Sequence, residues 1–236
     1  MTEVDRSLGG LTFSDLPSAE VDRLESYLVP LARSVRALID ATIRTTVESE
    51  EIRRVQAEID AATAALRARQ LPGPAGLHYN AEGRSWAWGN AVIGVRNALA
   101  VPMEVQRDES GLVYSDVVLG ASYEGPPGKV HGGVLALLLD HLMGDTASGR
   151  ERPTMTGTLT VRYRRATPLG ALRLEGRIDR HEGHKTIVLA HIADAEGITV
   201  EAEGIFVVPR WGRSPEPAQR SSAPAQRGLG GEEGRA

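Results

Sequence analysis

The residue types needed to attack a carbonyl group come together in one short stretch, which begins at His131 and ends at Asp140. Gly132 and Gly133 stand at the start of an expected helix, where unpaired N–H groups and the helix dipole favour developing negative charge. Because glycine has no Cβ atom, a ligand can approach this backbone closely. Asp140 lies further along the same helix and is a candidate general base or nucleophile. The stretch therefore predicts an oxyanion site followed by a reactive carboxylate.

The helix that carries Asp140 is apolar on every side from Val134 to Leu139, which predicts a helix that is buried all round. A buried, unpaired carboxylate costs roughly several kcal/mol, so we expect Asp140 to line a cavity or to have a partner. His141 follows it directly but lies about 100° away round the helix, so we do not expect these two side chains to pair.

The spacing of the two candidate groups bears on the assembly of the protein. Gly132 and Asp140 are eight residues apart, which corresponds to ~12 Å along a helix that rises ~1.5 Å per residue. An Asp side chain cannot span that distance to one carbonyl group, even when it leans toward the helix N-terminus. If both groups act on one substrate, they come from two copies of the helix. The spacing thus predicts at least a homodimer with two sites at its interface.

These residues carry a resemblance to a known family. His131-Gly132-Gly133 with Asp140, preceded by Tyr123-Glu-Gly-Pro-Pro-Gly128, resembles the active-site helix of hotdog-fold acyl-CoA thioesterases of the phenylacetate-pathway (PaaI-like) type. The lead-in looks most like the branch of the mammalian thioesterase superfamily members, and the resemblance covers about residues 90–209. It implies hydrolysis of acyl-CoA thioesters to free acid and CoA, without a metal or other cofactor. It also implies a homodimer or homotetramer with shared active sites.

The resemblance implies roles for individual residues of the stretch. The backbone amides of Gly132 and Gly133 are expected to stabilise the oxyanion, a task commonly worth ~3–4 kcal/mol per donor. His131 is expected to orient the substrate or to donate a hydrogen bond nearby. Asp140 is expected to activate water or to attack the thioester carbon itself.

A hydroxyl residue on the strand after the helix completes the family's site. Thr156 and Thr158 both fall in the right window, and strand alternation places them on the same face. The branch that this chain resembles most favours Thr156, which follows Asp140 by sixteen residues. We further expect Thr158, Val130 and Gly144 to contact the substrate.

The elements around this stretch predict an α+β fold. Two strands precede the helix, Met103–Arg107 and Leu112–Leu119, and Asp108-Glu-Ser-Gly111 forms the turn between them. Four more strands are expected after the helix, over residues 156–164, 172–180, 185–193 and 198–208. An antiparallel sheet wrapped around one long helix is the hotdog fold that the resemblance implies. We expect this domain to span residues 76–209.

The first 75 residues predict a helical extension. Apolar residues recur every three or four positions over residues 14–70, and Pro30 is expected to split a short first helix from a longer second one. The extension either covers its own domain or a partner subunit, or it is a regulatory domain. Its mixed charges argue against DNA binding. The last segment, residues 210–236, is rich in Pro, Gly and Ser and is expected to be disordered.

The composition excludes several other classes of protein. A net charge of −4 gives no general reason to bind nucleic acid or an anionic membrane. The absence of cysteine excludes disulfides, thiolate metal sites and cysteine nucleophiles. The histidines at 181, 184 and 191 do not form a zinc pattern. No apolar run approaches ~20 residues and no signal peptide is visible, so we expect a cytoplasmic protein without a membrane span.

Two alternatives to a hydrolase stay open. The first is a non-catalytic sensor, in which the hotdog domain binds acyl-CoA and the N-terminal helices transmit the signal. The presence of Asp140 argues against it, whereas the polar middle of the helical stripe keeps it open. The second is a hotdog hydratase or dehydratase, whose Asp/His pair usually follows a loop pattern that is absent from this sequence.

Overall fold

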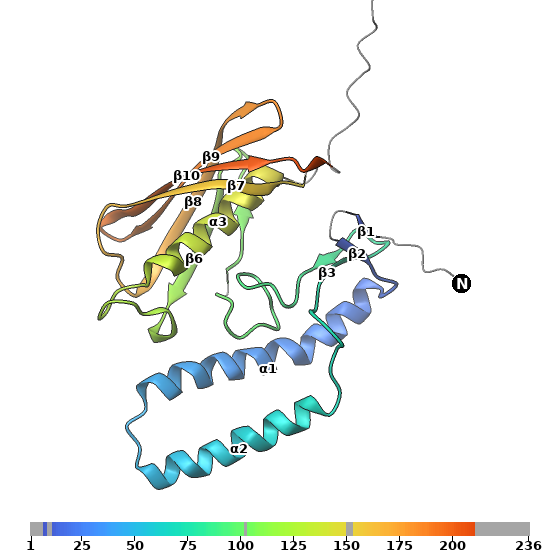
Figure 1. Ribbon diagram of the computed structural model, residues 1–236, viewed down its shortest axis with the longest axis vertical. Coiled ribbons are helices and arrows are strands. Elements are labelled where there is room, and N and C mark those ends of the chain that lie inside the picture. Colours follow the sequence, from blue (N-terminus) through green and yellow to red (C-terminus); the bar gives the residue numbers. More distant parts are fainter. Residues whose placement is uncertain (1–6, 9–10, 102, 150–152, 211–236) are drawn as a thin grey trace, which may run out of the picture.

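The computed structural model describes residues 7–8, 11–101, 103–149 and 153–210 of the chain (Figure 1). The first half contains a small sheet and two helices: β1 (Ser7–Leu8), β2 (Leu11–Phe13), α1 (Ser18–Arg44), α2 (Ser49–Arg67), β3 (Leu77–Tyr79) and β4 (Ser85–Trp86). The second half contains β5 (Gln106–Arg107), β6 (Val113–Leu119), the 3-10 helix η1 (Ala121–Tyr123), α3 (Gly132–Ser148), β7 (Met155–Tyr163), β8 (Gly170–Glu182), β9 (Lys185–Asp194) and β10 (Gly197–Val207).

Six strands of the second half form one antiparallel sheet in the order β5-β6-β8-β9-β10-β7, with α3 across one face (Figure 1). Leu138, Leu139 and Leu142 of α3 are fully buried and belong to one core with Phe206 of β10. This packing follows from the apolar run of the helix, which removes water from one whole face of the sheet. The α+β class and the hotdog arrangement are therefore confirmed.

One face of α3 departs from the sequence prediction. Its apolar sequence predicted burial on every side, but Leu137 is 41% exposed. Leu137 therefore lies on a side of α3 that the described part of the chain does not fully cover. A leucine left this open in the middle of a buried helix marks a surface that a second molecule can cover.

Strand β7 contains a bulge that changes which face its threonines occupy. Ile205 of β10 pairs with Thr158, but the next residue, Phe206, pairs with Thr156, so Gly157 is the extra residue on β7. A bulge of this kind shifts the side-chain alternation by one residue. Thr156 therefore points to the α3 side and Thr158 to the other side. The prediction that both lie on the same strand face was wrong, because alternation was assumed to continue through Gly157.

The helical extension also differs from its prediction. α1 continues through Pro30, and the break between the helices comes instead at residues 45–48. Proline costs a helix interior roughly 3 kcal/mol or more, but Val21 and Ala32 are buried on either side of Pro30 and hold the helix together. The chain leaves the helix at Thr45, whose Oγ1 accepts the Val47 N–H at 3.4 Å. A run of β-branched residues there gives the backbone an alternative to the helix.

α1 is anchored to the small sheet at its N-terminal end. Val21 is fully buried against Trp86 and Trp88. Glu25 accepts a hydrogen bond from the Trp88 indole N–H at 2.7 Å and from Arg84 at 2.9 Å. Apolar burial and a shared carboxylate therefore hold the start of α1 and the segment after α2 together.

None of the helices in the described ranges is long and apolar enough to cross a membrane. Of the tail expected to be disordered, residues 211–236 lie outside the described residues.

Candidate active site

The first turn of α3 presents one free amide rather than two. His131 is the N-cap residue of the helix. Its side chain caps the first turn, because Nδ1 accepts the Gly133 N–H at 3.0 Å. The Gly132 N–H has no hydrogen-bond partner among the residues that the structure describes. Because Nδ1 accepts a hydrogen bond, neutral His131 carries its proton on Nε2. The helix start therefore offers the Gly132 N–H and the His131 Nε2–H as donors.

Tyr163, the last residue of β7, holds this turn from the side. Its hydroxyl donates to the Gly132 carbonyl at 2.8 Å. A Cβ atom on residue 132 would lie 3.3 Å from that hydroxyl oxygen, which leaves little room for any side chain. Tyr163 is not among the site residues predicted from the sequence. The sequence signal for it was strand alternation, because Tyr163 follows Leu159 and Val161 on the inward-facing side of the strand.

Asp140 lies two turns further along α3, and its partner is on β7, the strand that also carries Tyr163. The Thr156 hydroxyl donates to Asp140 Oδ1 at 2.8 Å, and both residues retain some exposure to solvent. The bulge at Gly157 makes this contact, because it turns Thr156 toward the helix. One carboxylate oxygen is thus held by a hydroxyl donor. The other oxygen has no hydrogen-bond partner in the described part of the chain.

The remaining predicted site residues lie apart from this pair. Val130 is 4% exposed and its N–H donates to the Thr167 carbonyl, so its side chain belongs to the core. Gly144 lies on α3, and a Cβ there would meet the Phe206 ring at 3.6 Å. Thr158 is exposed on the outer side of β7. The structure therefore brings Asp140 to Thr156, and Gly132 to His131, in two separate places.

His141 follows Asp140 but makes no hydrogen bond to it within the described residues, in agreement with their positions round the helix. Burial lowers the pKa of His141 below its ordinary value of 6.5, and the nearby carboxylates of Asp145 and Asp140 oppose that shift more weakly. Burial disfavours the charged imidazolium in this apolar setting. The folded protein therefore binds a proton at His141 less readily than the unfolded chain does.

This shift predicts a pH dependence of stability. Because the folded pKa is depressed, the stabilisation is present above 6.5 and is lost as the pH falls and the unfolded chain takes up the proton. We expect the free energy of unfolding to fall between about pH 7.5 and about pH 5.5, and to fall less in His141→Gln. Urea unfolding at both pH values measures this. An equal pH dependence in both proteins would contradict it.

α1 reaches the candidate site through Tyr123 of η1. The Tyr123 carbonyl accepts the His131 N–H at 2.9 Å. Arg36 of α1 donates to the carbonyls of Asn97 and Ala100, both at 3.2 Å, and lies near the Tyr123 hydroxyl. Burial raises the pKa of the Tyr123 phenol, while Arg36 opposes this. The helical extension therefore supports the segment that leads into His131.

Removal of this support is expected to be measurable. Arg36→Ala leaves two carbonyls without their charged donor, so we expect the free energy of unfolding to fall by about 1.5 kcal/mol. Arg33→Ala is the matched control, because Arg33 is exposed on the same helix. Urea unfolding should separate the two variants. Equal stability in both would show that α1 is not anchored through Arg36.

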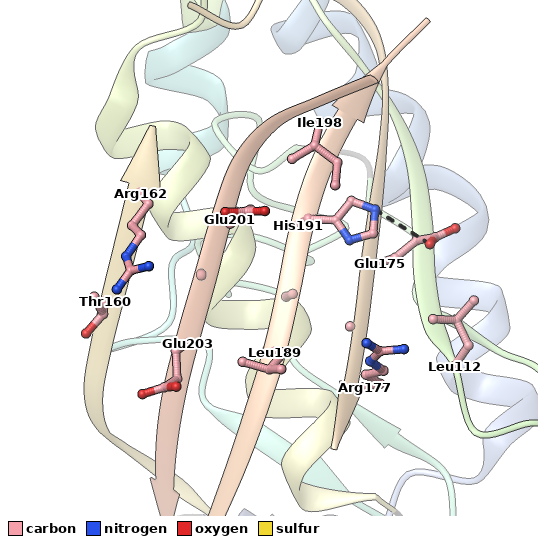
Figure 2. A pocket seen from close by; sticks show the side chains of 13 residues that line it. Leu112, Thr160, Arg162, Glu175, Arg177, Leu189, His191, Ile198, Glu201 and Glu203 are labelled. Atoms are coloured by element: carbon pink, nitrogen blue, oxygen red, sulfur yellow. Dashed lines mark ion pairs between the residues drawn. The ribbon is translucent and has the colours of Figure 1, made fainter. Parts of the chain in front are cut away.

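A cavity of about 490 Å³ lies on the opposite face of the sheet (Figure 2). A Cβ on Gly176 would meet Thr146 of α3, so Gly176 faces the helix and its neighbours Glu175 and Arg177 face the other way. His191 lies between the strands there, with Nε2 3.6 Å from a Glu175 carboxylate oxygen. None of the predicted site residues lines this cavity. Its walls carry charges of both signs, and we assign it no chemistry.

Comparisons with known proteins point to one family. A family model described as "Thioesterase superfamily" matches residues 127–201, which contain the start of α3, Asp140 and Thr156. The chain is 33% identical over 91 residues to acyl-coenzyme A thioesterase THEM4 of Xenopus laevis. This alignment covers 37% of this chain and 41% of that protein. The chain is 30% identical over 91 residues to THEM5 of Homo sapiens, with 37% of each chain covered. The match thus spans about two fifths of the length of these curated relatives.

A solved structure matches over a longer range. It is a crystal structure described as a thioesterase superfamily protein, and it is 32% identical to this chain with a TM-score of 0.68. The alignment covers 84% of this chain and 100% of that protein. A match over 84% of the chain is longer than the six-stranded sheet and α3 together, so it also includes part of the first half.

Proposed function

This chain belongs to the thioesterase superfamily, and from that membership we propose that it hydrolyses acyl-CoA thioesters to a free acid and CoA. The observation that carries the proposal is that α3 presents a free amide at its start and, two turns further along, the Asp140 carboxylate, which accepts the hydroxyl of Thr156 from β7. Relatives named acyl-coenzyme A thioesterases support the substrate class.

In this proposal Asp140 either activates the attacking water or attacks the thioester itself. As general base it takes a proton from water while the water oxygen bonds to the carbonyl carbon. As nucleophile it bonds to that carbon itself, and water then hydrolyses the acyl-enzyme. Thr156 holds one carboxylate oxygen by its 2.8 Å hydrogen bond, so the other oxygen is available for the reaction. In the general-base route the C–S bond breaks after water has added, whereas in the nucleophilic route it breaks as the acyl-enzyme forms, before water attacks; in both routes the CoA thiolate leaves and takes up a proton.

The charge on the carbonyl oxygen is stabilised at the other end of the helix. The Gly132 N–H lies at the positive end of the α3 dipole and has no partner within the described residues. A donor in this position commonly contributes ~3–4 kcal/mol to transition-state stabilisation. His131 Nε2–H is the second donor. Gly133 acts indirectly, because its N–H holds the His131 ring in place.

The two ends come together only between two copies of the chain, so we propose a homodimer with shared sites. Among the strands that the structure describes, β7 lies at the edge of the sheet and pairs with β10 alone. It carries Thr156 near its start and Tyr163 at its end, and these residues contact the two halves of the site. Antiparallel pairing of two β7 strands about their middle places Thr156 close to the partner's Tyr163. Asp140 of one copy then faces the glycine turn of the other.

An assay with a panel of acyl-CoA thioesters tests this function. A thiol reagent detects released CoA without background from the protein, since the chain contains no cysteine. We expect turnover of at least one acyl-CoA by the wild-type protein, with acyl chain length read from the panel. Binding of acyl-CoA without any release of thiol would contradict the hydrolase and would favour the acyl-CoA sensor.

A further inference from the structure

The segment of residues 97–100 is bound by two different elements. Arg36 of α1 donates to two backbone carbonyls of this segment, both at 3.2 Å. The Tyr123 hydroxyl of η1 donates to a third, the Leu99 carbonyl, also at 3.2 Å. The Arg36 guanidinium lies near that hydroxyl as well. The helical extension and the Tyr123 side chain are therefore joined through one short piece of backbone.

The backbone of Tyr123 fixes the residue that precedes α3. Its carbonyl accepts the His131 N–H at 2.9 Å, so the loop of residues 124–130 is closed where these two residues meet. The closure is tight, because a Cβ atom on Gly125 would lie 2.8 Å from the His131 Cα atom. Residues 124–128 of the loop are exposed, so packing against the rest of the chain contributes little to its position. The backbone of His131 therefore depends on where Tyr123 lies.

The Tyr123 ring itself has two kinds of contact. It is half-buried and packs against the core of the six-stranded sheet, and its hydroxyl binds the Leu99 carbonyl. Burial raises the pKa of the phenol above its ordinary value, so the hydroxyl remains a neutral donor at neutral pH. Phenylalanine in its place keeps the packing and loses only the link to residues 97–100. The two contributions of the side chain can therefore be separated by one substitution.

We propose that Tyr123 is a positioning residue for the hydrolysis, and that α1 acts on the start of α3 through it. Contacts run from Arg36 through residues 97–100 and Tyr123 to the His131 backbone. The inference rests on the proposed function, because it concerns the placement of the His131 ring and the Gly132 N–H as oxyanion donors. A misplacement of ~1 Å can cost about 10²-fold in rate. The helical extension thus takes part in catalysis rather than only covering the domain.

Tyr123→Phe in the full chain tests the positioning role. We expect kcat with the best acyl-CoA of the panel to fall by roughly 10-fold, because both oxyanion donors lose part of their placement. KM and the melting temperature are expected to stay close to the wild-type values. A fall in kcat at constant KM indicates a contact that matters only in the transition state. Tyr27→Phe is the matched control, since Tyr27 is 48% exposed on α1, and it is expected to leave kcat unchanged.

A double-mutant cycle tests whether α1 acts through Tyr123. Arg36→Ala, assayed well below its melting temperature, is expected to lower kcat, and the double variant with Tyr123→Phe is expected to lose no more than the stronger single variant. Wild-type kcat in Arg36→Ala, or losses that multiply in the double variant, would overturn the link to α1. Wild-type kcat in Tyr123→Phe would overturn the positioning role and leave the hydrolase standing. No turnover by the wild-type protein would overturn both.

Discussion

Asp140→Asn is expected to lower turnover of acyl-CoA by roughly 10²–10⁴-fold, which is the range for removal of a general base. Asparagine keeps the size of the side chain, and its carbonyl oxygen still accepts the Thr156 hydroxyl that contacts Asp140 at 2.8 Å. The melting temperature is therefore expected to stay close to that of the wild type. Steady-state kinetics with the best substrate of the acyl-CoA panel measures the effect.

Asp145→Asn is the matched control for this variant. Asp145 lies on the same helix, is exposed and pairs only loosely with Arg107, at 3.7 Å. A change of charge there is expected to leave turnover close to the wild-type value. Full activity in Asp140→Asn would remove Asp140 from the mechanism. An equal loss in both variants would indicate an effect of helix charge rather than of a specific base.

Gly132→Val is the second variant with a large expected effect. The added side chain meets the Tyr163 ring, since even a Cβ atom there lies 3.3–3.4 Å from three of its atoms. The turn or the tyrosine must then move, and the valine covers the free amide. We expect turnover to fall by roughly 10²–10³-fold, as for the loss of one oxyanion donor.

Tyr163→Phe distinguishes crowding from loss of the hydrogen bond to the Gly132 carbonyl. It removes the hydroxyl without adding volume, so we expect a smaller loss of turnover than in Gly132→Val. Wild-type activity in Gly132→Val, with the fold intact by circular dichroism, would show that this amide takes no part in the reaction.

The parts of the fold that rest on local chemistry could be predicted from the sequence. The apolar run after His131 predicted the long helix at the centre of the sheet, and the helix begins at Gly132 as expected. The cost of an unpaired carboxylate predicted that Asp140 lines a cavity or has a partner, and the structure shows a partner, Thr156. Both inferences depend on residues that are close in sequence or on a group that cannot stay unsatisfied.

Features that depend on long-range packing could not be predicted in the same way. Alternation alone placed Thr156 and Thr158 together, because the bulge at Gly157 arises from pairing with β10. Pro30 remains inside α1 because distant residues bury the helix on both sides of it. The His131 ring uses the Gly133 N–H, so the number of free amides depends on a side-chain rotamer that spacing does not reveal.

The most direct test of the shared site mixes the two inactive variants. Asp140→Asn and Gly132→Val are unfolded and refolded together in equal amounts, and mass spectrometry confirms that subunits have exchanged. Random pairing makes about half of the dimers heterodimers, each with one intact site that combines Gly132 of one copy with Asp140 of the other. We expect roughly a quarter of wild-type activity to return, because half of the dimers regain one of two sites. Mixed subunits without any regained activity would contradict the shared site.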